Sequence, residues 1–418
     1  MSDEGGGEMA CSRTSPAAEP LDDEDLLAEI LLRLPSHHSS LLCASLVCKR
    51  WRSIATHAAF RHRFSMHHRN AVFEECPREL KFTPLLDPPD HIPSERFSLD
   101  LSADKICSWS VLGCRHGRVL LLNLSANMLL VFEPTSRDTH RILVPPEFAL
   151  QVNAAVLCAA GDGQYHVHGD CHSRPFKVVV VGIRRHDAAA IARVYSQETG
   201  MWGDLASTRK PCAGVDLVLM GRPHPSTLIG NALYWRLTGY EDVILKFDLD
   251  NQSLTVIDWP PIDLIGQQRR IIRAEDGGLG LVILAYPRFQ LWEHKVDSHG
   301  VSTWVQQKNV NMYEVLGLKA YYAHITGYAE DADAIFLTCD PWRPVPVIIH
   351  LKSMKAEKHG VLLFKDYHPF TNFYTAERGV LHQPSGHRGT KAAWSSSCIY
   401  GIIYSLMIFI FLIAWLVQ

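Results

Sequence analysis

The sequence predicts an α+β multidomain protein, in which a small N-terminal helical module precedes a larger all-β domain of the β-propeller type. Two observations support this division. Up to about residue 70 the apolar residues recur at helical spacing, whereas from residue 71 short runs of Val, Ile, Leu and aromatic residues alternate with Gly, Asp, Asn, Ser and Pro. A third observation, an uncharged apolar stretch over 398–417, predicts a C-terminal transmembrane helix. The 418 residues are enough for two or three domains with buried cores.

Charge is unevenly distributed along the chain. Residues 1–25 carry eight acids against one base and are rich in Gly, Ser, Pro and Ala, so we expect 1–19 to be a disordered acidic leader. From Ile30 to Phe73 the sign reverses, with seven bases and no acid. The net charge of -3 argues against a surface built throughout for nucleic acid. The positive charge of this segment nevertheless predicts an acidic partner, either a nucleic acid or a protein.

The segment LDDEDLLAEILLRLP, which starts at Leu21, predicts the first helix. Its apolar residues form one stripe at helical spacing, made of Leu26, Leu27, Ile30, Leu31 and Leu34. Asp22 and Asp23 can cap the start of this helix, and Pro35 ends it.

A second helix is predicted from Leu41 to about Ala59, after the polar break SHHSS. On a helical wheel that takes Val47 as its origin, Trp51 and Ile54 fall on the apolar side, whereas Lys49 and Arg52 point away from it. We therefore interpret Trp51 as a core or docking residue and not as a platform on which bases stack. A plain helical hairpin with a solvated basic face is the alternative interpretation.

Together these segments resemble the F-box, the helical motif that binds the Skp-type adaptor of cullin-RING ubiquitin ligases. The match rests on the Leu-Leu-x-Glu-Ile-Leu-x-Arg-Leu-Pro helix, on Val-Cys-Lys-Arg-Trp-Arg and on Phe60. One departure is that Leu21-Asp22 stands where the motif usually has Leu-Pro.

The F-box resemblance implies a three-helix domain over 20–66 and a set of adaptor-facing residues. Carried over by position, this set is Leu21, Leu26, Leu27, Ile30, Leu31, Leu34, Pro35, Leu42, Val47, Cys48 and Trp51. The sequence does not separate the members that contact the adaptor from those that close the helical core. Because Skp-type adaptors are acidic, the resemblance also accounts for the basic charge.

Five segments of the β region share one form, a strand, a polar turn and a second strand, and each predicts a β-hairpin. They begin at Val131, Val194, Lys246, Leu291 and Ile348. Their interval of about fifty residues suits four-stranded blades of a kelch-like propeller, which we place over 71–380. A β-sandwich, or two smaller β domains, is the alternative.

The β region also resembles the F-box-associated domains of grass F-box proteins. Phrases that carry this resemblance include WSVLGCRHGRVLLLNL, FDLDNQSLTVIDWPP and IIRAEDGGLGLVIL. It implies a plant substrate receptor of an SCF-type ubiquitin ligase, which binds a cullin through the Skp-type adaptor and holds an unknown target protein on the β domain. A ligand- or nucleic-acid-binding propeller without a ligase role is the alternative.

Two segments invite a functional interpretation that we do not favour. YHVHGDCHSRPF gathers possible metal ligands, but no second pair of ligands follows, so a polar loop is preferred; the residues are His166, His168, Asp170, Cys171 and His172. EDGGLGLVIL precedes a strand and not a helix, so it predicts a β-turn. There is no GxSxG, HExxH or catalytic Cys-His signature. We therefore expect no metal, no cofactor and no enzymatic activity of the chain itself.

The C-terminal region predicts a tail anchor, with 385–397 as a flexible linker and 398–417 as a membrane-inserted helix. Arg388 and Lys391 would then lie on the cytosolic side. Two alternatives are a buried last strand and helix of the β domain, and a segment that the mature protein rarely carries. Scattered cysteines and the absence of a signal sequence place the folded body in a reducing compartment, cytoplasmic or nuclear, with a tail anchor facing the cytosol.

Overall fold

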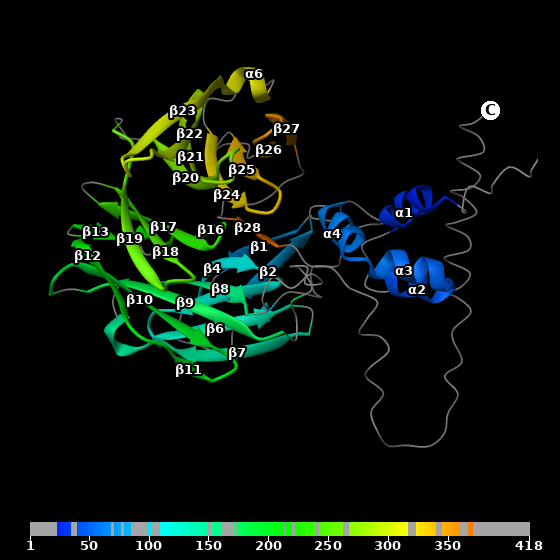
Figure 1. Cartoon of the computed structure of the whole chain (residues 1–418), viewed down its shortest axis with the longest axis horizontal. Helices are drawn as coiled ribbons and strands as arrows, with labels where there is room; N and C mark the ends of the chain where they lie inside the picture. The colour runs from blue at the N-terminus through cyan, green and yellow to red at the C-terminus, as the bar shows by residue number, and fades with distance from the viewer. Residues whose placement is uncertain are drawn as a thin grey trace, which may run out of the picture. The chain divides into compact units, whose positions relative to one another are not determined.

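A computed structural model of the chain describes a helical module and a β domain, which we treat separately (Figure 1). The described residues are 23–34, 40–67, 71–76, 79–84, 99–101, 109–134, 136–148, 152–159, 171, 174–184, 186–212, 214–219, 222–239, 242–261, 267–316, 323–339, 345–358 and 367–370. The predicted leader, linker and transmembrane segment lie outside these ranges. Within them, no helix is both long enough and apolar enough to span a membrane.

Over residues 23–34 and 40–67 the helical module has four helical segments, which are α1 (Glu24–Leu32), α2 (Ser40–Val47), α3 (Lys49–Thr56) and α4 (Ala58–His67). Asp23 caps α1, because its Oδ1 accepts hydrogen bonds from the backbone N–H groups of Asp25 (2.9 Å) and Leu26 (3.2 Å). The carboxylates of the first turn, Glu24 and Asp25, suit the positive end of the helix dipole. The predicted cap is thus confirmed.

The prediction of one continuous helix from Leu41 to Ala59, and of three helices in all, is wrong. Cys48 is extended, with φ -159° and ψ 170°, and it separates α2 from α3. Its Sγ accepts a hydrogen bond from the backbone N–H of Trp51 at 3.5 Å and so caps α3. A second extended residue, His57, separates α3 from α4. The apolar pattern alone hid both breaks, because cysteine and histidine are not strong helix terminators.

One hydrophobic core holds the four segments together. Its buried members come from all of them and include Leu27, Leu31, Leu41, Ala55, Phe60 and Phe64. Trp51 and Ile54 pack against this core without being fully buried, as the wheel predicts for that side of the helix. Phe60 and Phe64, one turn apart on α4, place their ring centroids 6.1 Å apart.

Among the described residues the β domain consists of six sheets of four or five strands and one of two strands. The first sheet joins both ends of the domain, since β28 (Tyr367–Phe370) pairs with β1 (Ala71–Cys76), which is followed by β2 (Glu79–Pro84) and β3 (Leu99–Asp100). Each of the other five is built from one continuous stretch of the chain. The first two consist of β4 (Ser110–Arg115), β5 (Arg118–Asn123), β6 (Met128–Glu133) and β7 (Asp138–Leu143), and of β8 (Val152–Cys158), β9 (Phe176–Ile183), β10 (Ala189–Ser196), β11 (Met201–Trp202) and β12 (Ala206–Pro211). The last three consist of β13 (Val215–Asp216), β16 (Thr227–Ile229), β17 (Ala232–Gly239), β18 (Val243–Asp248) and β19 (Ser253–Asp258); of β20 (Gln268–Arg273), β21 (Leu279–Ala285), β22 (Arg288–Val296) and β23 (Ser302–Asn311); and of β24 (Ala323–Ala329), β25 (Ala334–Cys339), β26 (Val345–His350) and β27 (Lys355–Lys358). Shorter elements are β14 (Val218–Leu219), β15 (Arg222–Pro223), the 3-10 helix η2 (Pro146–Phe148) and α6 (Met312–Leu316).

The six larger sheets are the blades of a β-propeller. Paired strands within each blade are antiparallel, and contacts between successive blades run around a ring. Most of these contacts join the first strands of the two blades, whereas the blade of β8 to β12 contacts the blade of β13 to β19 through β12 and β19. The contacts of β24 with β28 and of β28 with β4 close this ring. The alternatives of a β-sandwich or of two smaller β domains are therefore excluded.

Hydrophobic residues fill the spaces between neighbouring blades, which explains why the central strands are apolar on both faces. In β5, Leu120 and Leu122 belong to the core shared with the blade of β8 to β12, whereas Val119 and Leu121 belong to the core shared with the blade of β1 to β3. The strand β9 alternates in the same way between its two neighbours. A continuous apolar run is the pattern of a strand buried on both faces.

All five hairpins predicted from the sequence are present, as β6–β7, β10–β11, β18–β19, β22–β23 and β26–β27. Each is an outer hairpin of one of the five consecutive blades. The glycine-rich segment EDGGLGLVIL forms the predicted turn, between β20 and β21. Gly277 has a φ of 85° there, a conformation that favours glycine.

Candidate functional site

An apolar surface on the helical module contains part of the predicted adaptor-facing set. Leu26 and Val47 are exposed, at 41% and 58%, and Cys48 is also exposed. Ile30, Leu34 and Trp51 are half-buried. By contrast, Leu27 and Leu31 have no exposed surface and belong to the core. Leu21, Pro35 and the side chain of Leu42 lie outside the described part of the chain.

The helix α1 separates these two groups by its periodicity. Leu27 and Leu31 are one turn apart and face the core, while Leu26, Ile30 and Leu34 follow each other at intervals of four residues on an adjacent, more exposed side. Leu34, at the end of this row, also packs partly against the core. The sequence shows one wide stripe, and only the packing of α4 and α2 decides which half of it is buried. An exposed row of leucine and isoleucine on a small module is typical of a protein-binding surface.

The end of α2 adds a second exposed group, Leu46 at 47% and Val47 at 58%. A salt bridge between Arg50 and Glu24, with Nε and Oε1 3.9 Å apart, brings the start of α3 close to the start of α1. The sequence analysis missed Leu46, because a continuous helix through Cys48 gives no reason for its exposure. We refer to Leu26, Ile30, Leu34, Leu46 and Val47 as the docking surface.

Most basic side chains of the module interact within the module. Arg33 and Arg63 both form ion pairs with Glu29. The pair of Arg33, at 2.9 Å, lies within α1 and its C-cap, whereas the pair of Arg63 ties α1 to α4. Arg52 donates from Nε to the carbonyl oxygen of Ser45 at 3.1 Å, and Arg61 is buried. Lys49 remains exposed. The positive charge is thus partly used to hold helices together, which favours a protein partner over a phosphate backbone as the ligand of this module.

Glu29 gives the module a dependence on pH. Its hydrogen bonds to Arg63 and Arg33 hold the pKa of Glu29 below its ordinary value of 4.5. A carboxylate with a depressed folded-state pKa stabilises the fold above its unfolded pKa, and this contribution is lost as the pH falls through the folded-state pKa. We expect pepsin to cut within 24–67 faster as the pH is lowered from 4.5, and Glu29→Gln to show a smaller pH effect. An equal effect in both proteins, compared at each pH, would contradict this role.

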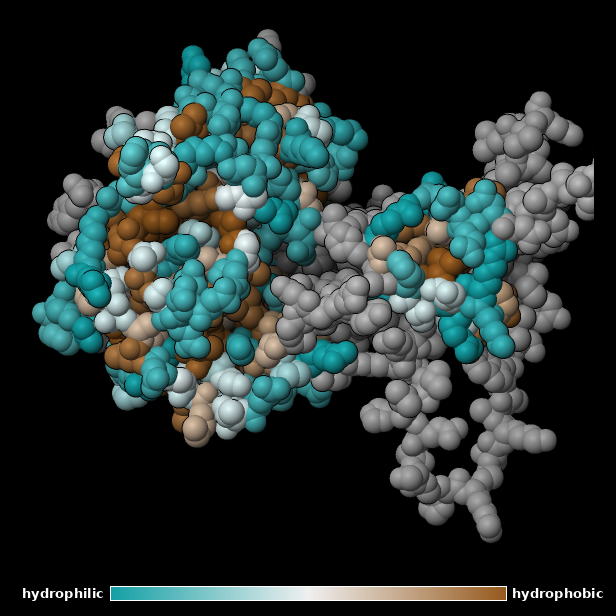
Figure 2. Space-filling model, viewed as in Figure 1, coloured by the Kyte–Doolittle hydropathy of each residue, from teal (hydrophilic) through white to brown (hydrophobic). Residues whose placement is uncertain are grey.

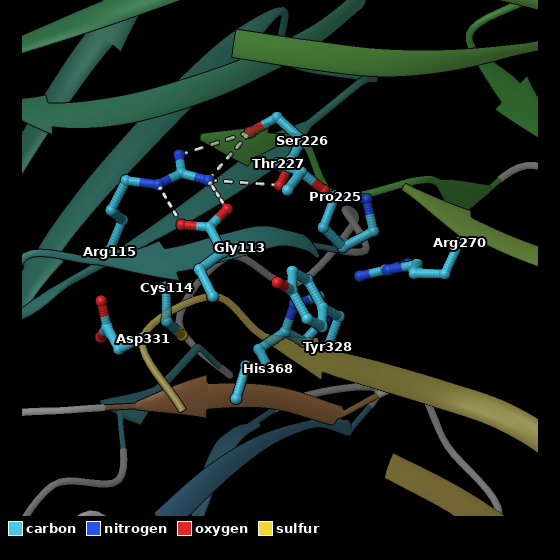
Figure 3. Close-up of a pocket in the computed structure, with 12 residues that line it drawn as sticks. Gly113, Cys114, Arg115, Pro225, Ser226, Thr227, Arg270, Tyr328, Asp331 and His368 are labelled. Atoms are coloured by element: carbon cyan, nitrogen blue, oxygen red, sulfur yellow. Dashed lines mark hydrogen bonds and ion pairs between the residues drawn. The ribbon is translucent and has the colours of Figure 1, made fainter. Parts of the chain in front are cut away.

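A second candidate site lies at the centre of the propeller, where residues of several blades line a pocket (Figure 3). Arg115 at the end of β4 makes a two-pronged ion pair with Glu330, which follows β24. The same guanidinium donates to the carbonyl oxygen of Ser226 at 3.2 Å and to its Oγ at 3.3 Å. Because β4, β24 and the strand after Ser226 belong to three different blades, this network fastens the ring across its centre.

The polar groups of the central pocket are engaged with one another. Besides Arg115, Glu330 Oε1 accepts a hydrogen bond from the backbone N–H of Leu228 at 2.8 Å. Tyr328 donates its hydroxyl to Asp333 at 2.9 Å, and burial raises the pKa of this tyrosine and of Cys114, so both stay protonated. Such a protonated thiol is a poor nucleophile. The sequence analysis missed this network, whose members are far apart in the chain.

The segment YHVHGDCHSRPF lies outside the described residues except for its Cys171 and its end. Cys171 is buried, and its carbonyl oxygen accepts a hydrogen bond from Arg118 at 2.7 Å. Within the described part of the chain, no three His, Cys, Asp or Glu side chains are placed so that they could hold a metal ion.

Comparisons with known proteins divide the chain in the same way. A family model described as "F-box protein AT5G49610-like, beta-propeller" matches residues 110–359, more than half of the chain and all five blades of consecutive strands. An F-box domain model matches residues 23–63. No curated protein matches the chain.

Two solved structures that resemble the chain are distant matches. A protein of unknown function from Bacteroides caccae is 9% identical over 70% of this chain and 93% of its own, with a TM-score of 0.40. A calcium-binding regucalcin from Agrobacterium tumefaciens is 13% identical over 60% and 75%, with a TM-score of 0.35. The kelch-like type and the grass-type F-box-associated domain stay predictions.

Proposed function

Since the chain belongs to the family of F-box proteins with an AT5G49610-like β-propeller, we propose that it is the substrate-recognition subunit of an SCF-type cullin-RING E3 ubiquitin ligase. F-box domains bind Skp-type adaptors and so enter cullin complexes. The observation that carries the proposal is the docking surface, five apolar residues left exposed or half-buried on the module that matches the F-box. In this proposal the propeller holds the target protein.

The proposed mechanism is positioning and needs no catalytic group of this chain. A target on the propeller, joined through the module to the adaptor and the cullin, is kept near a ubiquitin-conjugating enzyme that other subunits supply. The effective concentration of a target lysine near the activated thioester is thereby raised. Apolar contacts of the docking surface would supply most of the adaptor affinity, and the basic charge would raise the association rate with an acidic adaptor. We further propose a cytoplasmic or nuclear location for the folded domains.

The docking surface can be tested by the single variant Leu46→Asp in the full chain. Placing a carboxylate on an apolar surface that becomes buried in the complex is expected to weaken adaptor binding by about 30-fold or more. Binding of a purified Skp-type adaptor to immobilised protein, measured by biolayer interferometry, gives the dissociation constants.

Ser53→Asp is the matched control, because Ser53 is an exposed residue of α3 and lies on the side away from the core residues Trp51 and Ala55. It introduces the same charge into the same module and should change the dissociation constant by less than about threefold. Unchanged binding of Leu46→Asp, or an equal loss in Ser53→Asp, would contradict the assignment of the surface.

A further inference from the structure

The exposed apolar residues of α2 lie directly before a break in the helical backbone. Leu46 and Val47 are the last two residues of α2, and the extended residue Cys48 separates them from α3. Figure 2 shows that hydrophobic residues, drawn in brown, are exposed among hydrophilic ones on the helical module. We refer to residues 45–52, which run through this break, as the α2–α3 corner.

The end of α2 needs hydrogen-bond donors from outside the helix. The last four carbonyl groups of a helix have no intrahelical partner, and in α2 these belong to residues 44–47. Ser45 is only 3% exposed. A buried carbonyl group that finds no donor costs free energy, so a donor that reaches Ser45 stabilises the corner.

Arg52 supplies such a donor from α3. Its Nε donates to the carbonyl oxygen of Ser45 at 3.1 Å, seven positions back in the chain. Its backbone N–H donates to the carbonyl oxygen of Cys48 at 3.0 Å. An arginine at the end of a helix also suits the negative end of the helix dipole. One residue of α3 therefore bonds both to the last turn of α2 and to the residue at the break.

Two further polar contacts at the corner do not reach α2. The hydrogen bond from Trp51 to Sγ of Cys48 lies within the start of α3. The salt bridge of Arg50 with Glu24 joins α3 to α1. Hydrophobic packing in the core of the module holds α2 against α3, but such packing is not directional. The bond from Arg52 is thus a directional contact between the end of α2 and α3.

The direction of Leu46 and Val47 decides whether they can contact a partner together. Both residues follow Ser45 in the chain, so a fixed Ser45 carbonyl group fixes the peptide plane from which they continue. A binding surface that is correctly arranged in only a fraction of the molecules binds more weakly by that fraction. Loss of the Arg52 bond should therefore weaken adaptor binding without removing any apolar side chain.

We propose that Arg52 is a positioning residue of the docking surface: its Nε fixes the α2–α3 corner and thereby holds Leu46 and Val47 in the arrangement that the adaptor binds. This inference rests on the proposed function, because it concerns the interface through which the chain would enter the ligase. The role differs from that of a solvated charge that attracts an acidic partner, and the two roles make opposite predictions.

Two variants separate the hydrogen bond of Arg52 from its charge. In Arg52→Gln the amide nitrogen Nε2 follows Cδ as Nε does in arginine, so a neutral donor stands at the same place along the side chain. In Arg52→Lys the charge is kept, but a methylene group replaces the donor at this place. Arginine, glutamine and lysine have similar helix propensities, so the intrinsic stability of α3 is not the variable.

Dissociation constants for the Skp-type adaptor are measured on the full chain, as for Leu46→Asp. We expect Arg52→Lys to bind about five- to tenfold more weakly than the wild type, which is the effect of losing one hydrogen bond. Arg52→Gln should stay within about threefold of the wild type. Lys49→Gln is the matched control for the lost charge, because Lys49 is exposed on the same helix, and it should bind as Arg52→Gln does.

A second measurement detects the corner without the adaptor. Hydrogen exchange of the full chain should be about fivefold or more faster in Arg52→Lys than in the wild type in peptides that cover 46–52, and close to the wild type in Arg52→Gln. Peptides from 24–34 should keep their protection in both variants. A purely stabilising role of Arg52 would instead lower the protection of the whole module.

The proposal is overturned if Arg52→Gln loses as much adaptor affinity as Arg52→Lys or more, or if neither variant differs from the wild type. It is also overturned if Arg52→Lys loses protection over 24–67 as a whole. If the wild type itself did not bind the adaptor, the proposed function would fail, whereas the exchange comparison would still decide whether Nε of Arg52 fixes the corner. Normal binding of the wild type and lost binding of Leu46→Asp would leave the ligase proposal intact, whatever the outcome for Arg52.

Discussion

Replacing Arg118 by Met is expected to lower the free energy of unfolding of the propeller by about 3–5 kcal/mol. The side chain of Arg118 is fully buried, and its Nε donates to Glu133 Oε1 at 2.7 Å. Its NH2 donates to the carbonyl oxygens of Cys171 (2.7 Å) and Arg174 (2.6 Å). Methionine fills a similar volume but leaves Glu133 in the interior without the cation that compensates its charge.

Denaturant unfolding of the full chain, followed by tryptophan fluorescence, gives the free-energy change. Arg193→Met is the matched control, because Arg193 pairs with Glu147 at 3.0 Å with both side chains about a third exposed or less. That half-exposed pair should contribute at most about 1 kcal/mol.

A double variant separates the charge from the packing. Adding Glu133→Leu to Arg118→Met removes the buried carboxylate, so part of the lost stability should return. The recovery is incomplete, since the carbonyl groups of Cys171 and Arg174 still lack the donor that Arg118 supplies. If the double variant were less stable than the single one, the ion pair would not be the source of the effect.

Replacing Leu31 by Asp should unfold the helical module while the propeller stays folded. Leu31 has no exposed surface and lies in the core with Leu27, Phe60 and Phe64. Losing its packing and burying a carboxylate costs about 4–5 kcal/mol, which is most of the stability of a small module. Hydrogen exchange of the full chain should lose protection in peptides from 24–67 and keep it in peptides from 110–143.

Leu26→Asp is the control for this variant, because it adds the same group to the same helix at an exposed position. Protection of 24–67 should persist in Leu26→Asp although its adaptor binding is weakened. Both variants then lose the adaptor for different reasons, one through unfolding and one through the interface. Retained protection of the module in Leu31→Asp would mean that this leucine is not a core residue.

The sequence predicted those features that depend on neighbouring residues. The five hairpins follow from alternating strands and polar turns, and the start of α1 follows from Asp23 before an apolar stripe. Features that depend on packing were inaccessible. The stripe of α1 does not reveal that Leu27 is buried and Leu26 exposed, and the exposure of Leu46 follows from a helix break at Cys48 that no strong terminator marks.

The central network shows a different limit. Arg115 and Glu330 are 215 positions apart, and neither stands in a motif that calls for the other. The ion pairs of Asp242, which precedes β18, with Arg236 in β17 and Arg269 in β20 likewise join two neighbouring blades. Only the closed ring brings these residues together, and a single sequence contains no signal for that proximity.

The pairing of Ala71 with Phe370 has a mechanical consequence. The chain enters the propeller at Ala71 and leaves it at Phe370, and these two residues are partners in the antiparallel pairing of β1 with β28. A force that pulls the two ends apart would therefore break the hydrogen bonds between these strands one pair after another, and not all at once. The first step would remove the four residues of β28 and with them the contacts to β4 and β24. The pairing of β1 with β28, which completes the ring, is therefore also the place where mechanical unfolding of the propeller would begin.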